Sequence, residues 1–368
     1  MPSRIQRLGE QMGASGIDCV ALVPGPNMVY LTGLHFHLSE RPVIAFFPAA
    51  GQPALLVPAL EAVKAEQAPH ADEWQVFSYT DEEGPDGACT RLCAALKLSG
   101  QRLAVERLTM RVLELQMVQQ ESPGVQIVPA EPLLSHLRLS KDADELARMR
   151  QAVASAEEAL AHTLPQVRVG MTEQQVAAEL MVNLLKGGSQ GVPFPPLVQS
   201  GPNSASPHGA TSSRRLEAGD LLLIDFGATV DGYISDITRT FAIGALDPEL
   251  AKVHEIVQAA NAAGRAAAGP EMGCQDLDRV VRHVIEQAGY GSYFIHRTGH
   301  GIGLEVHEPP YIVAGNDRTL VAGLTFTIEP GMYLPGRGGV RVEDDVVITK
   351  DGSESLTTFE RRLQLLGR

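Results

Sequence analysis

Residues 221–240 constrain the fold of this chain more than any other stretch. They begin with the unbroken apolar run Leu221–Ile224, which predicts a strand buried on both faces and is followed at once by Asp225. A turn rich in glycine and aspartate then leads to a second β-rich segment, 233–241, which alternates like a hairpin partner and carries Asp236. Two carboxylates at the buried ends of paired strands repel each other and resist ionisation unless a cation lies between them.

The same segment has a plainer interpretation, in which Asp225 and Asp231 cap turns and Asp236 is solvated. The segment by itself does not decide between a structural and a functional role for these side chains. The remainder of the chain is needed for that decision.

The bulk properties of the chain exclude several classes of protein. A length of 368 residues favours two domains, and a formal charge of −14 argues against nucleic acid or an anionic membrane surface as a partner. No apolar run approaches the ~20 residues that a membrane span needs, and the N-terminus shows no secretory signal. The four cysteines form no paired pattern, so we expect reduced thiols and a cytoplasmic protein.

The first third of the chain predicts an α/β domain over roughly residues 1–130, because strand and helix patterns alternate there. Strands are expected at 19–23, 42–47, 54–57 and 103–105, and helices at 4–16, 60–67 and 89–98. No constellation of catalytic residue types occurs in this part of the sequence. The alternation breaks around 132–141, and we place the domain boundary there, giving domains 1–138 and 139–368.

The second part of the chain predicts an α+β domain with an antiparallel sheet. Capping boxes at Asp142-x-x-Glu145 and Thr172-x-x-Gln175 mark two helix starts. Helices are expected at 142–165, 172–187, 247–268 and 275–288, and strands at 221–228, 232–243, 324–329 and 339–349.

Three further residues in the second part complete a possible metal site. Glu329 and Glu343 lie in or at the end of apolar strands, as Asp225 and Asp236 do, and His300 lies in a turn flanked by glycines that allow close backbone approach. If these side chains converge, four negative charges need about four positive ones, which two divalent cations would supply. Oxygen ligands with one imidazole suit Mn²⁺, and also Co²⁺ or Zn²⁺. Two such ions would lower the pKa of a shared water toward neutrality.

Five segments carry a resemblance to a known family. The chain resembles the pita-bread dinuclear metallopeptidases, and most closely their Xaa-Pro branch of prolidase (Xaa-Pro dipeptidase) and aminopeptidase P. The segments are Leu-Ile-Asp-Phe-Gly-Ala, Tyr-Ile-Ser-Asp-Ile-Thr-Arg-Thr, Gly-His-Gly-Ile-Gly, Thr-Ile-Glu-Pro-Gly-Met-Tyr and Val-Arg-Val-Glu-Asp-Asp. Through residues 27–33, the first domain resembles the creatinase-type N-terminal domain of that branch. The resemblance implies an α+β pita-bread catalytic domain, a smaller α/β domain before it, and a homodimer.

The resemblance also assigns roles to individual residues. It implies that the metal ligands are Asp225, Asp236, His300, Glu329 and Glu343, and that Glu329 is also the acid and base of catalysis. His208 matches a substrate-binding histidine, and His307 matches the histidine that binds the scissile carbonyl. His296, Tyr333 and Arg341 match supporting polar groups around the substrate.

The implied activity is hydrolysis of the bond between an N-terminal residue and a following trans-proline, and we expect a dipeptidase. Prolidases usually bind the free proline carboxylate with a basic residue after the second histidine. Here the corresponding segment 309–318 offers Arg318, and Arg341 is a further candidate, but neither aligns with the family position. If neither reaches the pocket, the enzyme would accept longer Xaa-Pro peptides, as aminopeptidase P does. A non-catalytic binding protein on the same fold is the alternative from another class.

Overall fold

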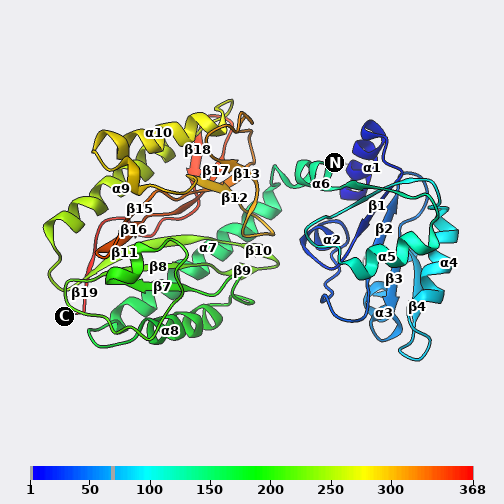
Figure 1. Cartoon of the computed structure of the whole chain (residues 1–368), viewed down its shortest axis with the longest axis horizontal. Coiled ribbons are helices and arrows are strands. Elements are labelled where there is room, and N and C mark those ends of the chain that lie inside the picture. Colours follow the sequence, from blue (N-terminus) through cyan, green and yellow to red (C-terminus); the bar gives the residue numbers. More distant parts are fainter. Residues whose placement is uncertain (1–2, 68–70, 368) are drawn as a thin grey trace. The chain divides into compact units, whose positions relative to one another are not determined.

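The structure is a computed structural model that describes residues 3–67 and 71–367 (Figure 1). It divides into two compact units, Met1–Arg138 and Leu139–Arg368. No helix in these described ranges is both long and apolar enough to cross a membrane.

The first unit is built on a six-stranded mixed sheet with strand order β4-β3-β2-β1-β5-β6. Its central strand β1 is fully buried, and it runs antiparallel to β2 and parallel to β5. The strands are β1 (Cys19–Leu22), β2 (Ile44–Pro48), β3 (Ala54–Pro58), β4 (Gln75–Tyr79), β5 (Arg102–Val105) and β6 (Gln126–Pro129). The helices are α1 (Arg4–Ser15), α2 (Pro26–Thr32), α3 (Ala59–Glu66), α4 (Asp86–Leu96), α5 (Val112–Glu121) and α6 (Glu131–Arg138), with a 3-10 turn η1 (Ala71–Glu73).

Five elements of this unit were not indicated by the sequence, namely strands β4 and β6 and helices α2, α5 and α6. Strands β4 and β6 form the two edges of the sheet, and most of their residues are partly or fully exposed. An edge strand of this kind carries no continuous apolar run, so its hydrophobic pattern is weak. The strands that the sequence did predict, such as β1 and β3, are buried along their whole length.

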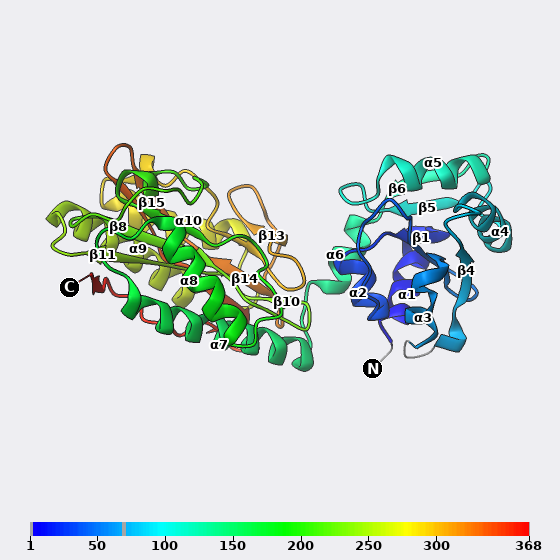
Figure 2. The same cartoon turned by 90° about the horizontal axis from the view of Figure 1, so that it is seen from below.

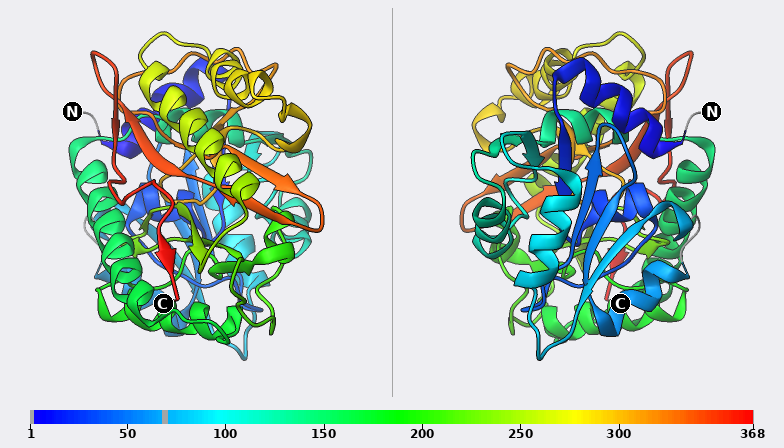
Figure 3. Two further views of the ribbon diagram at one scale, coloured as in Figure 1. Left: turned by 90° about the vertical axis from the view of Figure 1, so that its left-hand side faces the viewer. Right: turned by 90° about the vertical axis from the view of Figure 1, so that its right-hand side faces the viewer.

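The second unit consists of two similar halves, each with a helix pair packed on an antiparallel sheet. Helices α7 (Ala143–Thr163) and α8 (Glu173–Lys186) pack side by side (Figure 2) and share a core with strands β8 and β11. Helices α9 (Pro248–Ala267) and α10 (Cys274–Gln287) share a second core with strands β14 and β17. The strands of this unit lie between the two helix pairs (Figures 1 and 3).

The sheets of the second unit are antiparallel except for one short parallel edge. One sheet has the order β19-β11-β8-β7, another the order β13-β12-β14-β17-β18, and two hairpins pair β9 with β10 and β15 with β16. The strands are β7 (Leu197–Ser200), β8 (Leu221–Phe226), β9 (Thr229–Val230), β10 (Tyr233–Ile234), β11 (Ile237–Ile243), β12 (Gly299–Gly301), β13 (Glu308–Ile312), β14 (Thr325–Ile328), β15 (Gly331–Leu334), β16 (Gly338–Arg341), β17 (Asp344–Ile348), β18 (Ser353–Ser355) and β19 (Leu365–Leu366). The 3-10 turns are η2 (Leu164–Gln166), η3 (Gly201–Ala205) and η4 (Gly291–Tyr293).

Two strands predicted as continuous are interrupted in the structure, so those predictions were wrong in detail. The segment 232–243 is divided into β10 and β11, and 339–349 is divided into β16 and β17. In both cases the chain leaves one partner strand and joins another, since β16 pairs with β15 but β17 pairs with β14 and β18. The apolar pattern continues across the interruption because both parts are buried, and it carries no information about the hydrogen-bonding partner.

The turn before β10 explains one of the aspartates. Asp231 and Gly232 connect β9 to β10 with φ values of 48° and 81°, as a two-residue hairpin of left-handed turn residues requires. The Asp231 side chain accepts a hydrogen bond from Gln190 Nε2 at 2.9 Å and is exposed. Asp231 is therefore a turn residue, as the plainer interpretation expected.

One buried histidine in this unit makes the stability depend on pH. His254 of α9 is 1% exposed. Burial lowers its pKa to about 4 from an ordinary value of 6.5, and the nearby positive charge of Arg239 acts in the same direction. Between these two pH values the unfolded chain carries a proton that the folded chain does not. The free energy of unfolding therefore falls as pH falls from 6.5 to about 4.

We predict that His254→Gln weakens this acid sensitivity. Relative to the variant, the wild type should lose about 3 kcal/mol of unfolding free energy across the window. Urea unfolding of both proteins at pH 7.5 and pH 4, in metal-free buffer, measures the difference. His283→Gln at an exposed position of α10 is the matched control and should behave like the wild type. An identical pH dependence in wild type and His254→Gln would refute the account.

Candidate metal centre

The five predicted ligands come from strands and from the interruptions between strands. Asp225 lies in β8, where Thr238 of β11 is its cross-strand partner, and His300 is the middle residue of β12. The other three lie where the chain passes from one strand to the next: Asp236 between β10 and β11, Glu329 between β14 and β15, and Glu343 between β16 and β17. Such positions release the backbone from ladder pairing and allow the side chain to turn inward.

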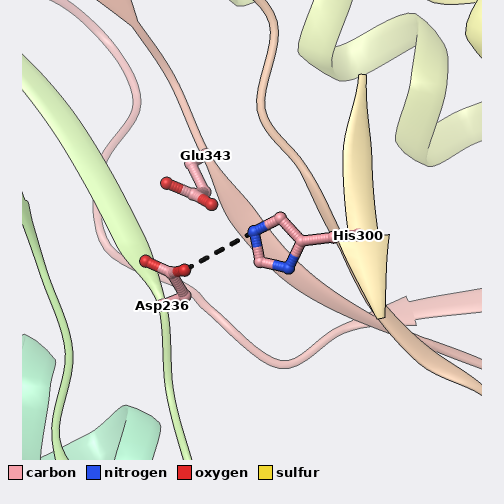
Figure 4. Close-up of side chains that lie close together, drawn as sticks. All are labelled: Asp236, His300 and Glu343. Atoms are coloured by element: carbon pink, nitrogen blue, oxygen red, sulfur yellow. Dashed lines mark ion pairs between the residues drawn. The ribbon is translucent and has the colours of Figure 1, made fainter. Parts of the chain in front are cut away.

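The side chains converge on one point. Ligand atoms of Asp236, His300 and Glu343 lie within 4.8 Å of one another, and Figure 4 shows the three pointing toward a common centre from separate segments. His300 Nε2 lies 3.7 Å from Asp236 Oδ2 and 3.4 Å from Glu329 Oε1. Two donors bound to one ion at ~2.1 Å lie about 3–4 Å apart, so these separations suit a shared cation.

The glycines around His300 permit this convergence by their lack of a side chain. A Cβ at Gly299 would stand 1.8 Å from the carbonyl oxygen of Thr327, and one at Gly301 would stand 2.4 Å from that of Pro309. Any larger residue would push β12 away from β13 and β14. The close backbone approach expected from the Gly-His-Gly pattern is thus confirmed, and its purpose is to bring His300 between two neighbouring strands.

The protonation of His300 suits it to bind a metal. Its Nδ1 donates a hydrogen bond to the carbonyl oxygen of Gly301 at 3.1 Å, which leaves the Nε2 lone pair directed at the carboxylates. Burial lowers the pKa of His300 well below its ordinary value, and the nearby His307 adds to the shift. The imidazole is therefore neutral at physiological pH, which is the form that binds metals.

Burial shifts the pKa values of the carboxylates upward, because it disfavours their ionised form. Burial raises the pKa of Asp236 and that of Glu343 well above the ordinary range, and neighbouring carboxylates add to both shifts. Burial also raises the pKa of Glu329 to about 7. Buried oxygens of Asp225 and Asp236 have no hydrogen-bond partner in the described part of the chain. Carboxylate oxygens that lack a positively charged partner, together with one neutral imidazole, form a set of ligands that is suited to divalent cations.

Arg341 is the principal cation in contact with this cluster, and its guanidinium binds three side chains. It forms an ion pair with Asp225 and donates hydrogen bonds to Tyr333 Oη at 2.7 Å and Thr238 Oγ1 at 3.1 Å. Thr238 in turn donates to Glu343 Oε2 at 2.5 Å. Arg341 thus fixes the orientation of two predicted ligands, one directly and one through Thr238.

The same arrangement fixes His296. Its Nδ1 donates to the carbonyl oxygen of Arg297 at 2.8 Å, so the neutral ring accepts a hydrogen bond at Nε2 from Tyr333 Oη at 2.9 Å. Burial lowers the pKa of His296 to about 4, and the positive charge of Arg341 acts in the same direction. His296 and Tyr333 therefore form a neutral pair beside the acidic cluster.

The residues of this cluster line a pocket of about 730 Å³. Its lining includes nine of the ten predicted site residues, and the tenth, Tyr333, contacts two of them. The predicted residues in the lining are His208, Asp225, Asp236, His296, His300, His307, Glu329, Arg341 and Glu343, and the others are Phe194, Leu197, Pro207, Arg297 and Val306. His208 and His307 are both exposed to solvent. The His307 ring lies 4.3 Å from that of His300, centre to centre.

Arg318 is not part of this lining. Its backbone carbonyl accepts a hydrogen bond from the Cys274 N–H, at the start of α10. This position does not fit the suggestion that Arg318 binds a substrate carboxylate.

The sequence analysis did not identify several residues that line the pocket or contact its acidic residues. Thr238 had a usable signal, because it lies two residues after Asp236 in a strand pattern and so points the same way. The sequence signal for Arg297 was weaker: it is a positively charged residue next to His296. The apolar residues Phe194, Pro207 and Val306 lie in irregular segments, where no periodicity identifies them.

Comparison with known proteins agrees with this geometry. The family model "Metallopeptidase family M24" matches residues 147–350, and "Creatinase/Prolidase N-terminal domain" matches residues 4–140. An Xaa-Pro dipeptidase from Lactobacillus delbrueckii subsp. lactis is 35% identical over 367 residues, which cover 98% of each protein.

Solved structures agree as well. A dipeptidase from Pyrococcus horikoshii OT3 matches with a TM-score of 0.93 and 37% identity, covering 99% of this chain and 100% of that one. An X-Pro aminopeptidase from Thermotoga maritima MSB8 matches with a TM-score of 0.87 and 33% identity, covering 99% and 100%. These matches confirm the expected fold class, a pita-bread catalytic domain preceded by a creatinase-type α/β domain.

The raised carboxylate pKa values predict that metal binding expels protons. Because burial raises the pKa of Asp236 and of Glu343 well above the ordinary value and that of Glu329 to about 7, the metal-free site keeps protons at a higher pH than ordinary carboxylates do, and divalent ions displace them on binding. Titration calorimetry with MnCl₂ in buffers of different ionisation enthalpy measures this exchange. We expect the observed enthalpy to vary with the buffer in the sense of proton release. An enthalpy independent of the buffer would contradict the account.

Proposed function

The chain belongs to metallopeptidase family M24, and on that premise we propose that it is an Xaa-Pro dipeptidase that hydrolyses the bond between an N-terminal residue and a following trans-proline. The observation that carries the proposal is the convergence of Asp236, His300 and Glu343 at a pocket that also exposes His208 and His307. The similarity to a protein named Xaa-Pro dipeptidase over nearly the whole chain supports the choice of substrate.

In this proposal five side chains hold two divalent ions, with manganese favoured over cobalt and zinc. The ligands are Asp225, Asp236, His300, Glu329 and Glu343. Their four carboxylates balance four positive charges, and the mixture of oxygens with one imidazole is moderately hard. When bound, the ions supply an activated water and a site of positive charge beside the scissile carbonyl.

The remaining roles belong to protein groups. His307 donates a hydrogen bond to the scissile carbonyl oxygen, where negative charge develops, and His208 binds the substrate from the same pocket. Glu329 accepts a proton from the attacking water. It then donates that proton to the proline nitrogen, which as part of a tertiary amide has no hydrogen of its own. Arg341, His296 and Tyr333 orient these groups around the substrate.

The setting of the enzyme is part of the same proposal. We place it in the cytoplasm, where its four buried, unpaired cysteines fit a reducing compartment. We assign it a homodimeric state and small peptides with proline at the second position as its partners. The division of the chain into a first domain of residues 1–138 and a catalytic domain of residues 139–368 belongs to this proposal too.

Aminopeptidase P activity is the second candidate, favoured by the similarity to an X-Pro aminopeptidase. Comparing hydrolysis of Ala-Pro and Ala-Pro-Ala by the manganese-loaded protein separates the two. We expect a higher kcat/KM for Ala-Pro. A strong preference for the tripeptide would overturn the dipeptidase assignment, and a protein that binds no divalent metal and cleaves neither would be a binding protein.

Replacing one central carboxylate should abolish the activity. We predict that Asp236→Asn lowers kcat for Ala-Pro by at least about 10³-fold, because the amide removes a negative charge that the cations require. Metal analysis of the purified protein should show fewer bound ions. Asp231→Asn is the matched control, since Asp231 lies in an exposed hairpin turn five residues away. Full activity in Asp236→Asn would remove this residue from the site.

A further inference from the structure

A buried ion pair lies beside the segment that carries His307. Lys141 pairs with Glu308, and the two side chains are only 3% and 5% exposed. Glu308 follows His307 directly and is the first residue of β13. Lys141 lies near the start of the second unit, just before α7. The ion pair therefore joins two segments that are 167 residues apart in the sequence.

The stability of the fold is a poor explanation for this ion pair. Removing both charges from water costs about as much free energy as their attraction returns, so an apolar pair of similar size would stabilise the fold equally well or better. An apolar pair would not supply a strong, directional bond between two particular atoms. The ion pair is thus better suited to fix a position than to stabilise the fold.

Lys141 is the fixed end of this bond. Its backbone N–H donates a hydrogen bond to the carbonyl oxygen of Gly323 at 2.8 Å. The preceding residue, Ser140, forms an antiparallel bridge with Leu324. These contacts attach Lys141 beside the start of β14, which is the middle strand of its five-stranded sheet.

The other end of the bond holds an irregular segment. Residues 302–307 connect β12 to β13 without regular secondary structure. Gly303 lies against the ion pair, since a Cβ at this position would stand 2.8 Å from Lys141 Cε and 2.9 Å from Glu308 Oε1. The same ion pair therefore contacts the segment near its beginning and just after its end.

His307 depends on this anchor because its side chain has no hydrogen bond to hold it. The side chain is exposed and makes no hydrogen bond or ion pair with any residue in the described part of the chain. Its ring stands edge-on to the His300 ring, 4.3 Å away from centre to centre. The direction in which His307 points is therefore set mainly by the backbone on either side of it, and Glu308 is its neighbour on one side.

We propose that Lys141 is a positioning residue, which acts through Glu308 to hold His307 at the scissile carbonyl. This role rests on the proposed function of His307. Misplacing a catalytic group by about 1 Å can lower a rate by about 100-fold, so loosening the segment should lower kcat. Because Lys141 acts through His307, loss of the ion pair should have little effect on a protein that already lacks this histidine.

Replacing the ion pair by an apolar pair tests this role. Lys141→Met/Glu308→Met leaves no charge unpaired, so we expect it to fold. For the manganese-loaded protein, kcat for Ala-Pro should fall about 10- to 100-fold and KM should change by less than about 3-fold, as for loss of a transition-state interaction. In His307→Ala, assayed at high enzyme concentration, the same two substitutions should change kcat by less than about 2-fold.

Arg150→Met is the matched control. It breaks an ion pair between α7 and Glu354 that is exposed on both sides, so its kcat should equal that of the wild type. An unchanged kcat in Lys141→Met/Glu308→Met would overturn the proposal. An equal loss with and without His307 would overturn it too, because a purely structural role gives that result.

A milder variant covers the case in which the apolar pair does not fold. Glu308→Gln is nearly isosteric and keeps an acceptor for Lys141 Nζ, but it loses the charge of the bond. It should lower kcat about 3- to 10-fold when His307 is present and by less than about 2-fold in His307→Ala. The same kcat in Glu308→Gln and wild type would then overturn the proposal.

Hydrogen exchange gives a readout that needs no substrate. In Glu308→Gln the backbone amides of residues 302–308 should exchange at least about 10-fold faster than in the wild type, while those of α9 should exchange as before. Equal exchange in the two proteins would show that the ion pair does not anchor the segment. A wild type that cleaves no Xaa-Pro peptide would overturn the proposed function instead, and hydrogen exchange would still decide whether Lys141 holds the segment.

Discussion

Repulsion among buried carboxylates is the constraint on which the second unit of this protein depends. Asp236 and Glu343 are almost completely removed from water, and besides burial the neighbouring carboxylates raise the cost of ionising each of them. Among the described residues, Arg341 is the only arginine or lysine that forms an ion pair with the side chain of a predicted ligand. The site is therefore incomplete as a protein structure alone, and divalent cations are the simplest addition that balances it.

The three consecutive acidic residues Glu343, Asp344 and Asp345 have different environments and different roles. Asp344 forms ion pairs with Arg239, Arg265 and Arg361. Burial alone would raise the pKa of Asp344, but Arg239 and Arg361 outweigh burial and lower the pKa to about 2. Asp344 is a structural anion that holds the C-terminal segment in place. Glu343, one residue earlier, turns toward the pocket, and Asp345, one residue later, accepts a hydrogen bond from the backbone N–H of Asp236 at 3.0 Å. The interruption before β17 makes this division possible.

The sequence predicted most of the fold because its signals were local. Capping boxes located the starts of α7 and α8 within a residue, and buried apolar runs located β1, β3 and β8. It failed where partners are distant in sequence. The breaks at Asp236 and Glu343 depend on which strand lies alongside, and the three arginines around Asp344 come from segments up to about 120 residues apart.

In the site, too, local sequence signals predicted some features, whereas others depend on residues that are distant in sequence. Residue types and strand pattern were enough to select the acids and His300, and the structure brings them together at one pocket. The family resemblance named Arg341, Tyr333 and His296 as supporting groups, but the hydrogen bonds that connect them with one another and with Thr238 could not be predicted, because they join side chains from segments far apart in the sequence.

Anomalous diffraction from crystals grown with MnCl₂ tests the central claim most directly. Data collected at the manganese absorption edge should show two strong peaks inside the pocket, both ligated by the side chains of Asp225, Asp236, His300, Glu329 and Glu343. A single peak, or none at saturating manganese, would contradict the account.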